Sequence, residues 1–167
     1  IAKILGPDAF GIPTAIISDA DPPIDRGVTW EEDEPRKAGS SFEISDRAVR
    51  LLNSFKDHDT VKVFCSEVTL EYDLAAAGEN NPAIMARLWE KNHPGARTFN
   101  TRKLEGAGSL EEKALVVWRG ICRANHSWSK ADFAHVLADW IRTHPNEDFA
   151  VPKYIRDAIE HTMSKLQ

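Results

Sequence analysis

The sequence has few cysteines, and their positions suggest neither a metal site nor a disulfide framework. Only Cys65 and Cys122 occur among the 167 residues, and they form no zinc-ligand spacing and no dense disulfide pattern. The six histidines show no zinc spacing either. These absences argue against a disulfide-rich secreted protein and a zinc protein, and they favour a reducing, cytoplasmic setting.

Long apolar runs are also missing. No segment approaches the roughly 20 consecutive apolar residues that span a bilayer. The first five residues, Ile1–Leu5, lack the basic region, apolar stretch and cleavage site of a signal peptide. We therefore expect no membrane association.

Basic residues are not in excess. The formal net charge is -5, whereas a protein that binds the nucleic-acid backbone usually carries a basic surplus. The acidic charge therefore argues against a generic nucleic-acid-binding protein. It argues less strongly against a metal-dependent enzyme, because bound cations supply positive charge to the phosphate. Walker A, dinucleotide-binding and nucleophile-elbow motifs are absent as well.

The length suits one domain, or one domain with a small helical appendage. A periodic apolar segment begins at Ile1, which is not a methionine, and predicts a helix over Ile1–Leu5 that continues an element cut off upstream. We therefore expect a fragment of a longer protein, with part of its active site missing.

An α/β pattern is predicted for the first half. Residues 13–18 form a short, non-alternating apolar run, typical of a strand buried on both faces of a parallel sheet. Residues 19–23 end this strand, because their prolines cannot donate to a sheet ladder. A polar loop is predicted over residues 22–41.

A helix and a second strand follow this loop. Ser45 or Asp46 caps the helix, and residues 60–65 form the strand. The apolar residues of the helix recur at helical spacing: Val49, Leu52 and Phe55. The order strand, helix, strand favours an α/β sheet with right-handed crossovers.

The second half predicts helices only. The first covers Thr69–Ala77, and the second is capped by Asn81, has Met85, Leu88 and Trp89 on its apolar side and ends at His93-Pro94-Gly95. A third helix covers Leu110–Ala124 and begins with a Ser109–Glu112 capping box. A fourth is capped by Ser129 and bears Phe133, Leu137, Trp140 and Ile141, and a fifth is opened by Pro152 and reaches His161. The change of pattern predicts an α/β core over residues 1–80 and a helical subdomain over residues 81–167 that packs on it.

Two aspartates follow the first predicted strand, where it ends. Asp19 and Asp21 are two residues apart, so the alternation of side chains lets both carboxylates point the same way while Ala20 faces oppositely. Ligands of open α/β sheets bind beyond the carboxyl ends of strands, and carboxylates suit Mg²⁺ or Mn²⁺. The pair indicates a metal site that activates a phosphodiester for hydrolysis. A simple Asx-type turn accounts for the same residues.

Glu71 lies in the first turn of the helix after the second strand. An acid there interacts favourably with the helix macrodipole by roughly 0.3–1 kcal/mol, which alone accounts for it. The alternative is that Glu71 extends the acidic cluster of Asp19 and Asp21. Asp73 is around 200° further around the helix, so Glu71 and Asp73 cannot easily face one ion.

Lys130 follows the Ser129 cap, in the first turn of a predicted helix. A cation there opposes the macrodipole at a small local cost. The residue is either a solvated surface lysine or, beside a metal site, a group that neutralises phosphate charge in the transition state.

Four segments, in this order, resemble one protein family. Residues 16–21 (IISDAD) are similar to the DxD strand of Toprim domains, which occur in topoisomerases, primases and some nucleases. Residues 63–75 (VFCSEVTLEYDLA), 129–134 (SKADFA) and 149–155 (FAVPKYI) narrow the likeness. The ordered set resembles the C-terminal Toprim region of OLD-family (overcoming lysogenization defect) nucleases over nearly the whole chain.

The resemblance implies a Toprim-like, mostly parallel sheet with flanking helices and a helical subdomain. It implies metal-dependent nicking and cleavage of DNA with two Mg²⁺ or Mn²⁺ ions, with Asp19 and Asp21 as metal ligands and Lys130 and Glu71 as catalytic residues. ATP would act only through an N-terminal ATPase domain. The complete protein would be a homodimer through that ATPase region, and this chain alone a monomer.

The chain departs from the family pattern in two ways. The glutamate-bearing strand that completes a Toprim metal site would lie before Ile1, and the ATPase is absent from this sequence. Two other functions stay open. A topoisomerase-type module would attack DNA with Tyr72 or Tyr154, but both lie in predicted helices without an evident supporting site. A non-catalytic recruitment module in DNA repair would bind partners through the same fold.

Overall fold

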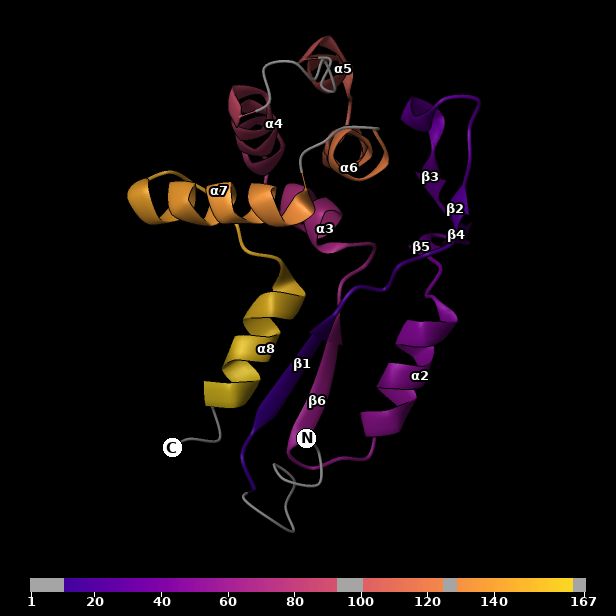
Figure 1. Ribbon diagram of the computed structural model, residues 1–167. Helices are drawn as coiled ribbons and strands as arrows, with labels where there is room; N and C mark the ends of the chain where they lie inside the picture. Colours follow the sequence, from indigo (N-terminus) through magenta and orange to yellow (C-terminus); the bar gives the residue numbers. More distant parts are fainter. Residues whose placement is uncertain (1–10, 93–100, 125–128, 164–167) are drawn as a thin grey trace. The chain divides into compact units, whose positions relative to one another are not determined.

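The computed structural model describes residues 11–92, 101–124 and 129–163, and it is a mixed α/β structure, mostly helical, with small sheets (Figure 1). The strands are β1 (Thr14–Ser18), β2 (Ile24–Asp25), β3 (Glu34–Pro35), β4 (Lys37–Ala38), β5 (Ser41–Phe42) and β6 (Val61–Cys65). The helices are a 3₁₀ turn η1 (Trp30–Glu32), α2 (Asp46–Phe55), α3 (Leu70–Ala76), α4 (Asn81–Asn92), α5 (Thr101–Gly106), α6 (Leu110–Trp118), a π-helical turn η2 (Arg119–Arg123), α7 (Lys130–Thr143) and α8 (Lys153–Met163).

The chain forms two compact units, each assembled from separated segments. Unit 1 comprises Ile1–Pro23, Pro35–Leu70 and Pro152–Gln167, and unit 2 comprises Ile24–Glu34 and Glu71–Val151. The division into domains at residue 80 stays a prediction.

Some expectations fall outside the described residues, namely the helix over Ile1–Leu5 and the helix-ending segment His93-Pro94-Gly95. Among the residues that the structure does describe, no helix combines the length and apolarity that crossing a membrane requires.

Unit 1 is built on a parallel pair of strands. Thr14 of β1 lies opposite Val61 of β6, and the register continues to Ser18 opposite Cys65. Helix α2, capped by the Ser45 hydroxyl, which accepts a hydrogen bond from the Ala48 N–H, connects the two strands and packs on β6. Helix α8 packs on both strands. The predicted order of strand, helix and parallel strand is confirmed.

The predicted burial of β1 on both faces is wrong. None of its five residues is fully buried, and the Ile17 side chain in the strand is 51% exposed. The reason is that β1 pairs with a single described strand, β6. A strand at the edge of a sheet keeps one side open, whereas the apolar run of residues 13–18 is typical of a central position.

The polar loop predicted over residues 22–41 is also more ordered than expected. Short ladders form within or beside it, β2 with β3 and β4 with β5, the latter antiparallel with Lys37 opposite Phe42. Strands of two residues carry no periodic signal, so the hydrophobic pattern could not reveal them.

An ion pair fastens the segment Ile24–Glu34 within unit 2. The Arg123 Nε lies 2.7 Å from Asp33 Oδ2, the Gly27 N–H donates to Asp33 Oδ1 over 3.1 Å, and the Arg119 Nε donates to the Asp33 carbonyl over 2.7 Å. Burial by itself raises the pKa of Asp33, but the Arg123 guanidinium and the Gly27 N–H outweigh it, so the pKa lies below its ordinary value of 3.8. Both arginines belong to η2, which therefore holds this segment in place.

Aromatic side chains fill the core of unit 2. Trp89 of α4 meets Phe133 of α7 edge to face, with ring centroids 5.4 Å apart, and Trp118 of α6 is 2% exposed. The predicted apolar residues of α4 and α7 are buried, except Ile141, which lies at the margin of its helix face. The capping box predicted for Ser109 and Glu112 at the start of α6 is confirmed. The predicted Ser129 cap of α7 is confirmed too, and Asp132 completes a capping box there.

Asn81 does not cap α4 as expected. The helix begins at Asn81 itself, and the fully buried side chain turns to other segments. Its amide nitrogen donates to the carbonyls of Leu74 and Ala150, at 2.6 and 2.8 Å, and its amide oxygen accepts from the Ala150 N–H at 3.0 Å. A buried amide gains more from three main-chain partners than from one helix N–H, so tertiary contacts override the local capping preference.

Replacing Asn81 by Ala is expected to lower the free energy of unfolding of unit 2 by about 3 kcal/mol, because half-buried main-chain groups of Leu74 and Ala150 lose their fully buried partner. All five tryptophan positions fall within the ranges of unit 2, so urea unfolding followed by tryptophan fluorescence measures this change. The neighbouring exposed Asn80→Ala variant is the control, with an expected change within about 0.5 kcal/mol. Equal effects of the two substitutions would contradict the role of the Asn81 side chain.

Candidate functional site

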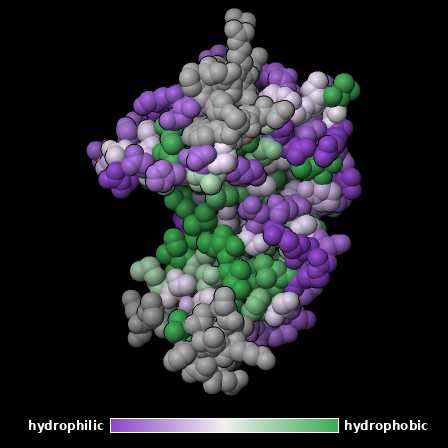
Figure 2. All heavy atoms as spheres, in the orientation of Figure 1, coloured by the Kyte–Doolittle hydropathy of each residue, from purple (hydrophilic) through white to green (hydrophobic). Residues whose placement is uncertain are grey.

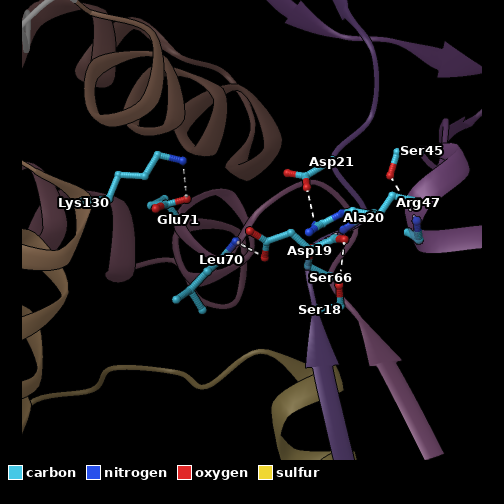
Figure 3. Close-up of polar contacts among 11 residues, drawn as sticks. Ser18, Asp19, Ala20, Asp21, Ser45, Arg47, Ser66, Leu70, Glu71 and Lys130 are labelled. Atoms are coloured by element: carbon cyan, nitrogen blue, oxygen red, sulfur yellow. Dashed lines mark hydrogen bonds and ion pairs between the residues drawn. The ribbon is translucent and has the colours of Figure 1, made fainter. Parts of the chain in front are cut away.

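The chain leaves β1 through a buried residue, Ala20, that holds the two predicted metal ligands in place. Ala20 is 1% exposed; its N–H donates to the Ser66 hydroxyl over 3.1 Å, and its carbonyl accepts from the Ser45 N–H over 3.0 Å. Ser66 follows β6 and Ser45 caps α2. The loops at the carboxyl ends of both strands and the start of α2 therefore meet at Ala20, with Asp19 and Asp21 on either side of it (Figure 3).

Asp19 lies at the start of α3. Its Oδ1 accepts a hydrogen bond from the Leu70 N–H over 3.0 Å, and Leu70 is the first residue of that helix. This contact satisfies one of the main-chain donors that a helix leaves unpaired at its N-terminus. Asp19 is half-buried and turned toward Leu70 (Figure 3).

Asp21 takes a left-handed backbone conformation and pairs with Arg47. Its φ of 46° belongs to a region in which aspartate is tolerated because of its short polar side chain. Its N–H donates to the Val68 carbonyl over 3.0 Å, and its Oδ2 lies 2.6 Å from Arg47 Nη2. The strand ends at Ser18, so this turn, rather than the pleat of an extended chain, sets the direction of the Asp21 side chain.

The Asp21–Arg47 pair is exposed and therefore exchangeable. The side chains of Arg47 and Asp21 are 66% and 47% exposed, and ion pairs in such surroundings contribute about 0–1 kcal/mol. A cation can compete with Arg47 for this carboxylate at little cost.

A hard divalent cation such as Mg²⁺ needs few protein ligands. Mg²⁺ binds through one or two carboxylates and keeps several water ligands. Within the described ranges, no group of three or more His, Cys, Asp or Glu side chains is arranged around a common ion position. Asp19 and Asp21 thus supply two carboxylates, each engaged by a partner of its own, and a cation held by them would complete its coordination with water.

Glu71 and Lys130 are brought together within unit 2. The Lys130 Nζ lies 3.5 Å from Glu71 Oε2, and the Ser129–Asp132 capping box fixes the turn of α7 from which Lys130 extends. Glu71 is 8% exposed, while the Lys130 side chain is about half exposed. Burial lowers the pKa of Lys130, but Cys122 and the Glu71 carboxylate outweigh this, so the pKa is raised and the amine stays charged at neutral pH.

Cys122 is a third member of this cluster that sequence reasoning missed. Its Sγ lies 3.5 Å from Glu71 Oε2, and burial together with the Glu71 charge raises the pKa of the thiol to about 12. Cys122 belongs to η2, whose π-helical turn aims the thiol at Glu71. Nothing in a single cysteine without a motif signals such a position.

The four predicted site residues thus form two groups, one in each unit. Asp19 and Asp21 belong to unit 1, and Glu71 and Lys130 belong to unit 2. No family model, curated protein or solved structure matches the chain. The resemblance to OLD-family nucleases stays a prediction, and any function assigned to the chain depends on its own residues.

Alkylation by iodoacetamide at pH 8 is expected to label Cys65 well before Cys122. A thiol with a pKa of about 12 holds roughly 1,000-fold less thiolate than one with the ordinary value of 9.0. Burial and the Asp19 charge raise the pKa of the Cys65 thiol too, so the difference between the two cysteines is smaller than this upper limit. Labelling of Cys122 should therefore accelerate only as the pH rises toward 12, and Glu71→Gln should speed it at pH 8 by removing the adjacent charge. Mass spectrometry of single Cys→Ser variants assigns each site.

The exposed Glu105→Gln variant is the control for this measurement and should leave the Cys122 rate unchanged. Equal reactivity of Cys65 and Cys122 would show that Glu71 and the surrounding core do not protect the thiol.

Proposed function

We propose that the chain is the metal-dependent DNA-cleaving part of a Toprim-type nuclease. One observation carries the proposal: Asp19 and Asp21 flank the buried Ala20 at the carboxyl end of a parallel strand. This is where α/β sheets bind ligands. The parallel β1–β6 pair, connected through α2, supports a Toprim-like core, as the resemblance of residues 16–21 suggests.

In this proposal Asp19 and Asp21 hold Mg²⁺ or Mn²⁺. When bound, such a cation polarises a phosphodiester and lowers the pKa of a coordinated water. Leu70 and Arg47 orient the two carboxylates beforehand, through the contacts at 3.0 and 2.6 Å. Arg47 also keeps the Asp21 charge balanced until a cation replaces it.

The resemblance gives Lys130 of unit 2 a role of its own, which is to oppose the negative charge of a DNA phosphate. Its raised pKa keeps the ammonium group protonated, and its side chain is half exposed, so a backbone phosphate can reach it. Glu71, 3.5 Å away, positions the lysine. The DNA is the substrate, and control by ATP would come from an ATPase domain outside this sequence.

A non-catalytic module is the second candidate, because both aspartates already have protein partners. Asp19 accepts from Leu70 and Asp21 pairs with Arg47, which is how purely structural turn residues behave. A topoisomerase-type reaction is less favoured. Tyr72 is 3% exposed and the Tyr154 hydroxyl is buried, so neither tyrosine presents a nucleophile to DNA.

Replacing Asp19 by Ala in the complete protein is expected to reduce Mg²⁺- or Mn²⁺-dependent nicking of supercoiled plasmid at least about 100-fold, because one of two metal ligands is lost. Calorimetric titration with Mn²⁺ should show weaker binding in parallel. Asp57→Ala, at a highly exposed acid of unit 1, is the matched control. Nicking by the Asp19 variant at the wild-type rate would refute the metal role, and the absence of Mn²⁺ binding by the wild type would favour the non-catalytic module.

Lys130→Gln is expected to lower the rate of nicking by about 10- to 100-fold while leaving Mn²⁺ affinity unchanged, because the lysine stabilises charge and does not bind the metal. Lys113→Gln, which removes another partly exposed lysine of unit 2, serves as control. A loss of metal affinity in the Lys130 variant, or a normal rate, would contradict the assigned role.

A further inference from the structure

Arg47, the ion-pair partner of Asp21, extends from a fixed position on α2. It lies in the first turn of that helix, and the Ser45 N–H ties the start of the helix to the Ala20 carbonyl over 3.0 Å. Asp21 follows Ala20 directly, and its Oδ2 lies 2.6 Å from Arg47 Nη2. The main chain therefore keeps Arg47 beside Asp21 even when the two charges separate.

The guanidinium group of Arg47 can turn to another anion without a change in the backbone. Its side chain is 66% exposed, and the contact with Asp21 is an ion pair at the surface of unit 1. Guanidinium groups bind phosphates through two parallel hydrogen bonds, which makes arginine a common residue for phosphate recognition. Arg47 can therefore exchange its carboxylate partner for a phosphate.

The charge of unit 1 does not oppose DNA, although the chain as a whole is acidic. Lysine and arginine equal aspartate and glutamate in number within the ranges of unit 1, so the net charge of -5 belongs to unit 2. Figure 2 shows hydrophilic side chains over the part of unit 1 where Figure 1 draws α2. Arg50, one turn after Arg47 on this helix, is exposed as well.

The local charge at Asp21 decides whether a phosphate is attracted or repelled. Asp19, Asp21 and Arg47 together carry one formal negative charge in excess, which repels a phosphate. With a divalent cation on the two carboxylates, the same groups carry one positive charge in excess, which attracts it. In that state Arg47 no longer has Asp21 to itself and lies beside an anion of the opposite sign.

We propose that Arg47 is a DNA-contacting residue that becomes available when a divalent cation binds to Asp21. Without a cation, the Asp21 carboxylate holds the guanidinium group. With a cation there, Arg47 pairs with a phosphate of the DNA backbone instead. The cation and the DNA then strengthen each other's binding by the same factor, as linkage requires. Because Arg47 is released only if Asp21 binds the cation, this role rests on the function proposed above.

Replacing Arg47 by Gln in the complete protein is expected to change cation binding and DNA binding in opposite directions. Calorimetry should show Mn²⁺ binding about two- to fivefold tighter than in the wild type, because an exposed ion pair no longer competes. Fluorescence anisotropy with a short labelled DNA duplex in Ca²⁺, which takes the same oxygen ligands, should show at least about fivefold weaker DNA binding. In EDTA the two proteins should bind DNA equally within about twofold.

The control for these measurements is Arg156→Gln, at an exposed arginine of α8 in unit 1. It should leave the Mn²⁺ affinity unchanged and should weaken DNA binding no more in Ca²⁺ than in EDTA. Gel electrophoresis of the duplex after each titration checks that the DNA is intact.

Asp21→Asn releases Arg47 in the absence of any cation. DNA binding in EDTA should become at least about fivefold tighter, and this gain should vanish in the double variant Asp21→Asn, Arg47→Gln. Asp57→Asn removes another exposed acid of unit 1 and controls for the loss of a negative charge. Its gain in DNA affinity should be smaller and should persist in the Arg47→Gln background.

Three results overturn the role of Arg47: an equal effect of Arg47→Gln on DNA binding in Ca²⁺ and in EDTA, a gain in the Asp21 variant that does not need Arg47, or looser Mn²⁺ binding by the Arg47 variant. The last result means that Arg47 supports cation binding and does not compete with it. If the wild type binds no Mn²⁺, the proposed function itself is refuted, and the role of Arg47 with it.

Discussion

The parallel ladder between β1 and β6 is the constraint on which unit 1 depends. Because Thr14 lies opposite Val61 and Ser18 opposite Cys65, the two strands end at the same level. The loops that follow then meet, and Ala20 is buried where they do. The hydrogen bonds of Ala20 to Ser66 and Ser45 hold this crossing together, and they place Asp19 and Asp21 on either side of it.

The carboxylates of the chain are held by partners of very different strength. Asp33 is buried and paired with Arg123, so its charge belongs to the architecture of unit 2. Asp21 shares its charge with Arg47 across an exposed contact that solvent screens. Glu71 lies between these extremes, shielded from water yet close to the half-exposed Lys130. The exposed Asp21–Arg47 contact is therefore the most readily exchanged of the three, and the buried Asp33–Arg123 pair is the least.

Local patterns predicted most of the elements correctly, and they failed where distant segments decide. The Ser45, Ser109 and Ser129 caps and the buried faces of α4 and α7 follow from residue order and spacing, because a helix repeats its contacts within a few positions. The prediction that Asn81 caps a helix was wrong, because its side chain binds the main chain of Ala150, which is 69 residues away in the sequence. The predicted burial of Ile17 was wrong too, because the sequence of an apolar strand does not indicate how many strands lie beside it.

The candidate site divides in the same way. The sequence by itself determined that carboxylates follow an apolar strand, that Lys130 opens a capped helix and that the first half is α/β, because these are properties of neighbouring residues. Only the tertiary structure decided which partner each charge has: Arg47 for Asp21, the Leu70 N–H for Asp19, and Lys130 with Cys122 for Glu71. The residues of these pairs lie 26 to 59 positions apart in the sequence. Whether such pairs form depends on packing and desolvation, which no local sequence pattern records.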